Sequence, residues 1–341
     1  MKKCFVLTLL LLLITGCGSM NLDKAVGDFT KSVDASKSYH LDGTMEINSG
    51  EETFTYNIDV AFLKDDYYKV ILVNQTNNHE QVILKNKEGL YVVTPSLNKS
   101  FKFDSIWPDN SSQSYLLKNL VEDIKNDSET TFEKNDQGYI IKTKVNYPNN
   151  DELAYQKLFF DKDMKINKVE VYNLDDIVQI RMIFKNVDLK AKYRDSDFDL
   201  SKLIKEDTHK EDKCEGENCD AKTMLTIENV VYPLYIPANT HLSGNETIDT
   251  EEGNRIILTF GGEKNFVLVE ETLATNDEME IIPVFGDPLM LNETIGAMSS
   301  NSISWDNGNI SYYLVSSNLS SNELVNVAKS LTGTKSVMSN K

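Results

Sequence analysis

Few side chains in this sequence are candidates for catalysis, and they form no known motif. Four histidines, His40, His79, His209 and His241, are spread along the chain. None has a serine or cysteine partner in a recognisable nucleophile pattern, which hydrolysis by an activated side chain would need. We therefore interpret the histidines as structural or surface residues.

Two further patterns have a chemical interpretation that the rest of the sequence does not support. Gly-Gly-Glu-Lys at 261–264 suggests a phosphate loop, but the chain lacks G-x-x-x-x-G-K-[ST] there, so we predict a hairpin turn. Adjacent acids at 65–66 and 175–176 could serve a glycosidase, yet paired acids are expected on solvated turns of so acidic a chain. The sequence therefore predicts a protein that is not an enzyme and needs no cofactor, and a hydrolase is the weakest alternative.

The N-terminus has the pattern of a bacterial lipoprotein signal peptide. Lysines at positions 2 and 3 precede an apolar run at 5–14, which leads into Leu-Ile-Thr-Gly-Cys at 13–17. The run is too short to span a bilayer, which needs about 20 apolar residues. This lipobox predicts cleavage after residue 16 and a diacylglyceryl group on Cys17.

Lipidation of Cys17 predicts a protein anchored on the extracytoplasmic face of the plasma membrane. Two acyl chains, such as palmitate, hold a protein on a bilayer where one chain is marginal. The alternative is a secreted protein in which Cys17 is incidental. The net charge of −18 excludes nucleic-acid binding and leaves the lipid as the attachment to the membrane.

Hydrophobic periodicity predicts a mainly β fold with a few helices. Apolar residues recur at helical spacing over 22–33, and they alternate with polar residues over 39–47 and 54–62. Further strands are predicted at 67–73, 81–84, 90–94, 100–104, 130–133, 139–145, 154–160, 165–172 and 178–187. A sheet of about ten strands tends to curl, and its apolar face needs a cover. A helix over 115–124, with Ser111 or Ser112 as N-cap, is the predicted cover.

Residues 201–222 are almost wholly polar or charged and predict a linker that contains Cys214 and Cys219. Outside the cytoplasm, this C-x₄-C pair most simply closes a disulfide loop, and a pair of free thiols is the alternative. A metal site with His209 as a third ligand matches none of the usual zinc spacings, so no metal is expected.

The C-terminal part predicts a small α+β domain. Strands are expected at 225–231, 255–260, 265–270, 280–284, 303–305 and 311–315. Ser320 and Glu323 form a capping box that opens a helix ending near Leu331. The predicted organisation is a signal peptide at 1–16, a half-barrel domain at 17–200, a linker at 201–222, an α+β domain at 223–333 and a tail at 334–341.

One string is distinctive: T-P-x-L-N-K-S-F-x-F at 94–103, followed by Trp107-Pro108 and by Asn-Ser-Ser-Gln at 110–113. With the lipobox, the first helix and the strands before it, this segment resembles the LolA/RseB-like lipoprotein-carrier superfamily, which includes outer membrane lipoprotein-sorting proteins. Within it, the segment is most similar to the YdcC-type sporulation lipoproteins of Gram-positive bacteria. Residues 284–331 resemble the small domain that follows the carrier-like domain in those proteins.

The resemblance implies an unclosed antiparallel β-barrel with a helical lid, followed by a small α+β domain. It also implies a ligand cavity, for which the candidate lining residues are Phe101, Phe103, Trp107, Leu117, Leu120, Val121 and Ile124. An apolar pocket with few polar groups suits an aliphatic ligand and needs no catalytic residue. Alternatively, the same side chains pack the helix against the sheet and leave no cavity.

Two functions follow from the resemblance. The first is a membrane-anchored lipoprotein that binds an acyl, lipid or lipoprotein ligand in its half-barrel during cell-envelope or spore assembly. The second is a non-catalytic interaction or regulatory lipoprotein that acts on another exported protein in sporulation or germination.

Replacing Cys17 with Ser tests the lipobox. Because no other lipid attachment site is predicted, the variant should accumulate as an uncleaved or released precursor. Metabolic labelling with a fatty-acid analogue should tag the parent and leave Cys17→Ser untagged; a tagged variant would contradict the assignment.

Overall fold

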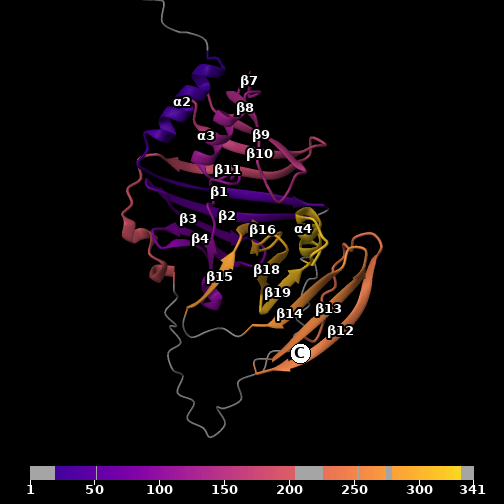
Figure 1. Ribbon diagram of the computed structural model, residues 1–341. Coiled ribbons are helices and arrows are strands. Elements are labelled where there is room, and N and C mark those ends of the chain that lie inside the picture. The colour runs from indigo at the N-terminus through magenta and orange to yellow at the C-terminus, as the bar shows by residue number, and fades with distance from the viewer. Residues whose placement is uncertain (1–19, 51, 204–225, 252, 274–278, 332–341) are drawn as a thin grey trace, which may run out of the picture.

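The computed structural model describes residues 20–50, 52–203, 226–251, 253–273 and 279–331. Within them, two β-sheets lie side by side, the first mostly indigo to magenta and the second orange to yellow (Figure 1). The predicted lipidation site Cys17 and the cysteine pair Cys214 and Cys219 lie outside the described residues. Lipidation, the disulfide and the division of the chain into domains therefore stay predictions.

The first sheet is a long, curled meander with the strand order β15-β6-β5-β4-β3-β2-β1-β11-β10-β9-β8-β7. Its strands are β1 Ser38–Ser49, β2 Glu52–Leu63, β3 Tyr67–Asn74, β4 Glu80–Asn86, β5 Gly89–Thr94, β6 Lys99–Asp104, β7 Thr131–Lys134, β8 Tyr139–Lys144, β9 Leu153–Phe160, β10 Ile166–Asn173, β11 Val178–Asp188 and β15 Glu280–Phe285. Neighbouring strands are antiparallel except β15, which runs parallel to β6. The sheet does not close on itself, so the predicted fold class is confirmed: a mainly β, unclosed antiparallel half-barrel.

Alternation of apolar residues places one row of side chains on the concave face of this sheet. On β1, Tyr39, Leu41, Gly43 and Met45 are buried, and the residues that alternate with them are partly exposed. The ring of Tyr39 stacks on that of Phe62 from β2 at 4.7 Å. On the convex face, Phe198 covers a second, smaller apolar cluster.

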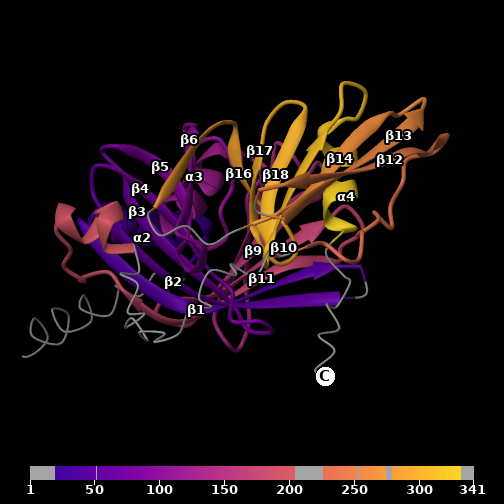
Figure 2. The same ribbon diagram turned by 90° about the horizontal axis from the view of Figure 1, so that it is seen from below.

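Two helices cover the concave face, α2 (Leu22–Asp34) and α3 (Leu117–Asn126) (Figures 1 and 2). The side chain of Asn21 caps α2 by accepting a hydrogen bond from the backbone N–H of Lys24 at 2.9 Å. Phe29, on the buried face of α2, meets the ring of Phe160 edge-on at 5.1 Å. No helix in the described part of the chain has the length and apolar character needed to cross a bilayer.

The start of α3 differs from the prediction. The helix begins at Leu117, and its N-cap residue, Leu116, makes no capping hydrogen bond through its side chain. The hydroxyl of Ser112 instead donates to Oδ1 of Asp123 at 2.8 Å. Neither Ser111 nor Ser112 is therefore the N-cap: the Ser112 hydroxyl bonds to Asp123, and the Ser111 hydroxyl donates to the carbonyl of Ser112 at 3.4 Å.

The second sheet has the strand order β12-β13-β14-β19-β18-β17-β16. Its strands are β12 Thr240–Thr250, β13 Gly253–Gly262, β14 Phe266–Thr272, β16 Asp287–Met290, β17 Ile295–Met298, β18 Ser302–Asn307 and β19 Ile310–Val315. Helix α4 (Ser321–Lys329) packs on it through buried apolar residues.

The sequence patterns did not predict β12, β16 or β17. They predicted a strand at 225–231, which is wrong, because residues 226–231 form no strand. The side chain of Asn254 accepts a hydrogen bond from the backbone N–H of Ile227 at 2.7 Å and donates to its carbonyl at 3.3 Å. An amide side chain thus takes the place of a neighbouring strand.

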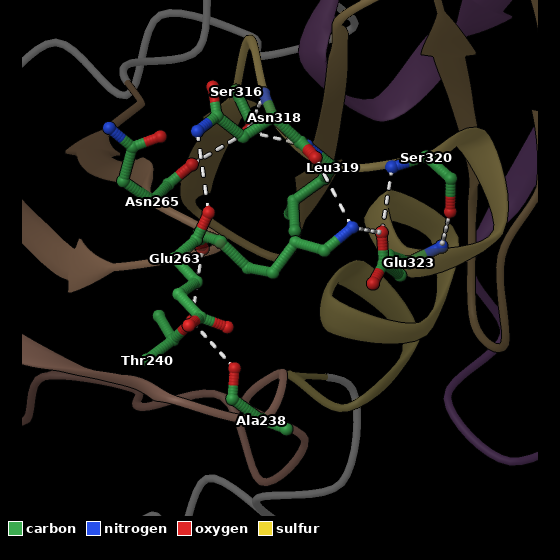
Figure 3. A network of polar contacts seen from close by, with 10 residues as sticks. Ala238, Thr240, Glu263, Asn265, Ser316, Asn318, Leu319, Ser320 and Glu323 are labelled. Carbon is green, nitrogen blue, oxygen red and sulfur yellow. Dashed lines mark hydrogen bonds and ion pairs between the residues drawn. The ribbon is translucent and has the colours of Figure 1, made fainter.

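The capping box is confirmed, and it belongs to a wider network (Figure 3). The backbone N–H of Ser320 donates to Oε2 of Glu323 at 2.8 Å, and the backbone N–H of Glu323 donates to Oγ of Ser320 at 3.3 Å. Nζ of Lys264, in the turn between β13 and β14, donates to the same Glu323 oxygen at 3.1 Å. Glu323 therefore ties the predicted hairpin turn to the start of α4.

A buried ion pair joins the two sheets. Nζ of Lys99, the first residue of β6, lies 2.9 Å from Oδ1 of Asp306 on β18, and the two side chains are 7% and 1% exposed. Lys99 belongs to the distinctive string at 94–103. Asn98 precedes it in the left-handed conformation, with φ of 48°.

Neutral hydrogen bonds complete this junction. Gln81 accepts a bond from the backbone N–H of Ile295 at 2.6 Å and from Oγ1 of Thr294 at 3.1 Å. The hydroxyl of Tyr56 donates to the carbonyl of Asn292 at 2.6 Å. These hydrogen bonds attach β2 and β4 of the first sheet to residues 292–295 of the second, which lie between β16 and β17 and at the start of β17.

Replacing Lys99 with Met tests the junction. The variant should lose about 3 to 5 kcal/mol of unfolding free energy, because Asp306 becomes a buried charge without a partner. The double variant Lys99→Met/Asp306→Leu should recover most of that loss, since it removes both charges. Urea unfolding measures both values.

A matched control is Lys144→Ala, which removes a lysine from an exposed ion pair with Glu129. It should cost no more than about 1 kcal/mol. Equal losses in Lys99→Met and in the double variant would show that the buried charge is not the cause.

Candidate functional site

The seven candidate cavity residues come together in one packed cluster. Their exposed fractions run from 0% for Leu120 to 6% for Phe101, and all seven belong to the main apolar core. Phe101 and Phe103 extend inward from β6, and Leu117, Leu120, Val121 and Ile124 form the buried face of α3. The lid helix therefore packs against a filled core.

Trp107 is the candidate that also borders an open cleft. Its ring meets that of Tyr68 edge-on at 5.9 Å, so one part of the side chain packs in the core. Another part lines a cleft of about 130 Å³ between the first sheet, the 105–116 loop and the second sheet. Ile124 borders a separate groove between α2 and α3.

The cleft has apolar walls from segments far apart in the sequence. Ile47 and Ile180 line it from β1 and β11, Leu289 and Met290 from β16, and Val325 from α4. Its volume is close to the roughly 150 Å³ of a dry cavity that holds one benzene molecule. Sites for whole small-molecule ligands have about 300 to 1,000 Å³. The cleft therefore suits one apolar side chain better than a lipid chain.

Polar groups fix the loop that forms one wall of the cleft. Nδ2 of Asn119, on α3, donates to the carbonyls of Pro108 at 2.8 Å and Ser111 at 3.1 Å. Nδ2 of Asn110 donates to Oδ1 of Asp287 at 2.9 Å, and Ser105 donates to the same oxygen. The lid helix, the loop and the start of β16 thus hold one another in place.

Two titratable groups on the cleft are shifted by burial. Burial lowers the pKa of the Lys329 ammonium, and the nearby carboxylate of Glu152 opposes the shift. Burial also raises the pKa of the Tyr147 hydroxyl, as does the charge of Asp123. Both groups add polarity to the lining of the cleft.

Asp123 attaches the lid helix to the sheet. It accepts hydrogen bonds from Ser112 and, at 2.7 Å, from Nε2 of Gln156 on β9. Burial raises the pKa of its carboxyl to about 6, although both bonds favour the charged form. The group acts as a structural tether between α3, the loop and β9.

The three histidines in the described part of the chain lie on different elements. Nε2 of His40 lies 2.7 Å from Oδ2 of Asp59, His79 is half-buried with a pKa lowered by desolvation, and His241 is exposed on β12. His209 lies outside the described residues. In the part of the chain that the structure describes, no three metal-ligating side chains gather.

Sequence analysis found Trp107 but missed the other walls of the cleft. Asp287, Met290 and Lys329 are contributed by β16 and α4, more than 170 residues after Trp107. β16 has only 4 residues, too few for a clear alternation of apolar and polar positions. No local signal could have placed these residues beside Trp107.

The fold and the site together define a half-barrel protein with a ligand-binding or interaction role. No family model matches the chain. The chain is 36% identical over 343 aligned positions to the sporulation protein YdcC of Bacillus subtilis (strain 168), an alignment that covers 98% of each chain. The protein belongs to the family of this sporulation protein.

Solved structures show weaker similarity. A chain of the MucA/MucB complex of Pseudomonas aeruginosa is 12% identical with a TM-score of 0.32, covering 89% of this chain and 97% of that one. A putative outer membrane lipoprotein-sorting protein domain from Vibrio parahaemolyticus is 11% identical with a TM-score of 0.32, covering 53% of this chain and 97% of its own.

Replacing Phe103 with Ala distinguishes a filled core from a lidded cavity. Phe103 is 5% exposed and packs in the core, so its truncation should leave a void and lower the unfolding free energy by about 3 to 5 kcal/mol. The matched control Phe285→Ala truncates a phenylalanine that is 79% exposed and should cost far less. Equal small losses in urea unfolding would indicate that Phe103 borders open space.

Proposed function

We propose that the protein is a non-catalytic, lipid-anchored interaction protein that binds another exported protein outside the cytoplasm during sporulation. Membership of the sporulation protein family supports the cellular process. The lipobox that ends in Cys17 supports the anchor and the location.

The filled half-barrel is the observation that carries this proposal. The concave face that would hold an acyl chain in a carrier is occupied by the chain's own side chains from α2, α3 and β6. The junction through Lys99 and Asp306 seats the second sheet across the remaining end. A cleft of about 130 Å³ stays open where the two sheets meet, and wider grooves lie beside α3 and between α2 and α3.

The volume of this cleft is close to that of one large side chain, of the kind that anchors a protein interface. Such interfaces are dominated by a few large side chains that fill well-packed pockets near their centre. Trp107, Ile180 and Met290 offer apolar contact, and Asn110 and Lys329 offer polar groups at the same opening. An aliphatic or aromatic side chain of the partner, inserted here, would bury its apolar part beside these polar groups.

An acyl or lipid ligand is the second candidate, and the apolar lining of the cleft favours it. To hold a lipid chain, the cleft would have to enlarge by displacing α3 or the second sheet. Both are fastened by hydrogen bonds from buried or half-buried side chains, among them Asn119 and Gln81. The cost of breaking them makes this candidate weaker than protein binding.

Photo-crosslinking in a sporulating host tests the proposal. A benzoylphenylalanine placed at Gln179, which lines the cleft, should give a discrete adduct of the size of a second protein. The variant Ile180→Trp, which fills the cleft, should lose this adduct while still reaching the membrane.

The matched control places the same photoreactive group at Lys162, in an exposed turn away from the cleft. It should give no such adduct. An adduct at Gln179 whose added mass is only that of a lipid would support the carrier function instead.

A further inference from the structure

The two sheets present four edges, and three of them carry features that prevent a further strand from pairing. β7 has only 4 residues and ends in Glu133 and Lys134. β15 contains Pro283, and β16 has 4 residues and contains Pro288. Short length, lysine and proline are the usual means by which proteins protect exposed edges.

The fourth edge, β12, is neither short nor interrupted by lysine or proline, and its one irregularity lies near its start, between Leu242 and Gly244. It is 11 residues long, Thr240–Thr250, and contains no lysine, arginine or proline. Among the described residues its backbone pairs with β13 and with no other strand. Alternate N–H and C=O groups along its outer side are therefore free to pair with an added strand.

The side chains of β12 are also accessible. Every one of its residues is exposed or half-buried, including Leu242 at 40% and Ile248 at 39%. Both views place β12 on the side of the second sheet away from the half-barrel (Figures 1 and 2). A strand added there would disturb neither the lid helix nor the junction through Lys99.

Charge identifies the kind of strand that fits. Glu246 and Asp249 lie on β12, Glu251 follows it, and the whole chain has a net charge of −18. Edge-to-edge pairing of two copies would bring these acids together, which is unfavourable. A strand with lysine or arginine would complement them.

We propose that β12 is a docking edge, to which an extended, basic segment of another exported protein adds as a further strand of the second sheet. Backbone hydrogen bonds would supply affinity, and the acids of β12 with Leu242 and Ile248 would select a segment that carries both basic and apolar residues on one face, because Glu246 and Ile248 share a face of β12. The proposal rests on the interaction role proposed above but not on the cleft, which is lined by other elements.

Binding of a synthetic peptide with a repeating Lys-Lys-Val-Val sequence, which places Lys and Val in turn on each face of a strand, to residues 21–341 tests this docking edge. The peptide should bind and should slow hydrogen exchange at amides within 240–250. A peptide of the same composition with every second amide N-methylated keeps the charge but cannot complete a strand, so it should bind at least about tenfold more weakly. Equal binding of both peptides would overturn the proposal, because attraction to an acidic surface would then explain it.

Two variants locate the site. Ile248→Lys places a cation on the edge and should weaken peptide binding by about tenfold. Thr259→Lys adds the same charge on exposed Thr259 of the neighbouring strand β13 and should change it far less. Protection outside 240–250, or equal effects of the two variants, would contradict the assignment.

Sedimentation of the protein without peptide tests whether β12 pairs with a second copy of the chain instead. A monomer is expected; a dimer that Ile248→Lys dissolves would assign the edge to a second copy and overturn the proposal. The cleft variant Ile180→Trp should bind the peptide as the parent does, so failure of the docking edge and failure of the cleft are distinguishable.

Discussion

The structure depends on one buried ion pair, Lys99 with Asp306. Two charges removed from water are tolerated only when they stay together, so β6 of the first sheet and β18 of the second cannot separate without a large cost. The parallel strand β15 joins β6 directly after Asn98, where the backbone N–H of Glu280 donates to the Asn98 carbonyl at 2.8 Å. Asn98 and Lys99 of the distinctive string at 94–103 thus serve the assembly of the two sheets.

The position of the second sheet determines how much free space remains on the concave face of the half-barrel. One end of the concave face is covered by α2 and α3, and the other by β16, β17 and α4. The aromatic side chains of β6 become core, and Trp107 and Tyr115 of the loop after it also line the remaining cleft. The concave face beside α2, α3 and β6 is thus packed with the chain's own side chains.

Local patterns predicted much of this fold, because helices and alternating strands depend on neighbours in the sequence. The first helix, the half-barrel strands and the capping box at Ser320 followed from spacing alone. β12 was missed because both its faces are accessible, so it has no apolar alternation. The partner of Lys99 lies 207 residues away, and apolar residues that line a cavity have the same pattern as those that pack a core.

Native mass spectrometry of the soluble fragment 21–341, purified from a sporulating host, tests the filled half-barrel most directly. The account predicts the mass of the polypeptide alone under conditions that preserve bound lipids. A stoichiometric lipid adduct, retained at low activation energy, would show that the half-barrel opens to hold a ligand and would contradict the account.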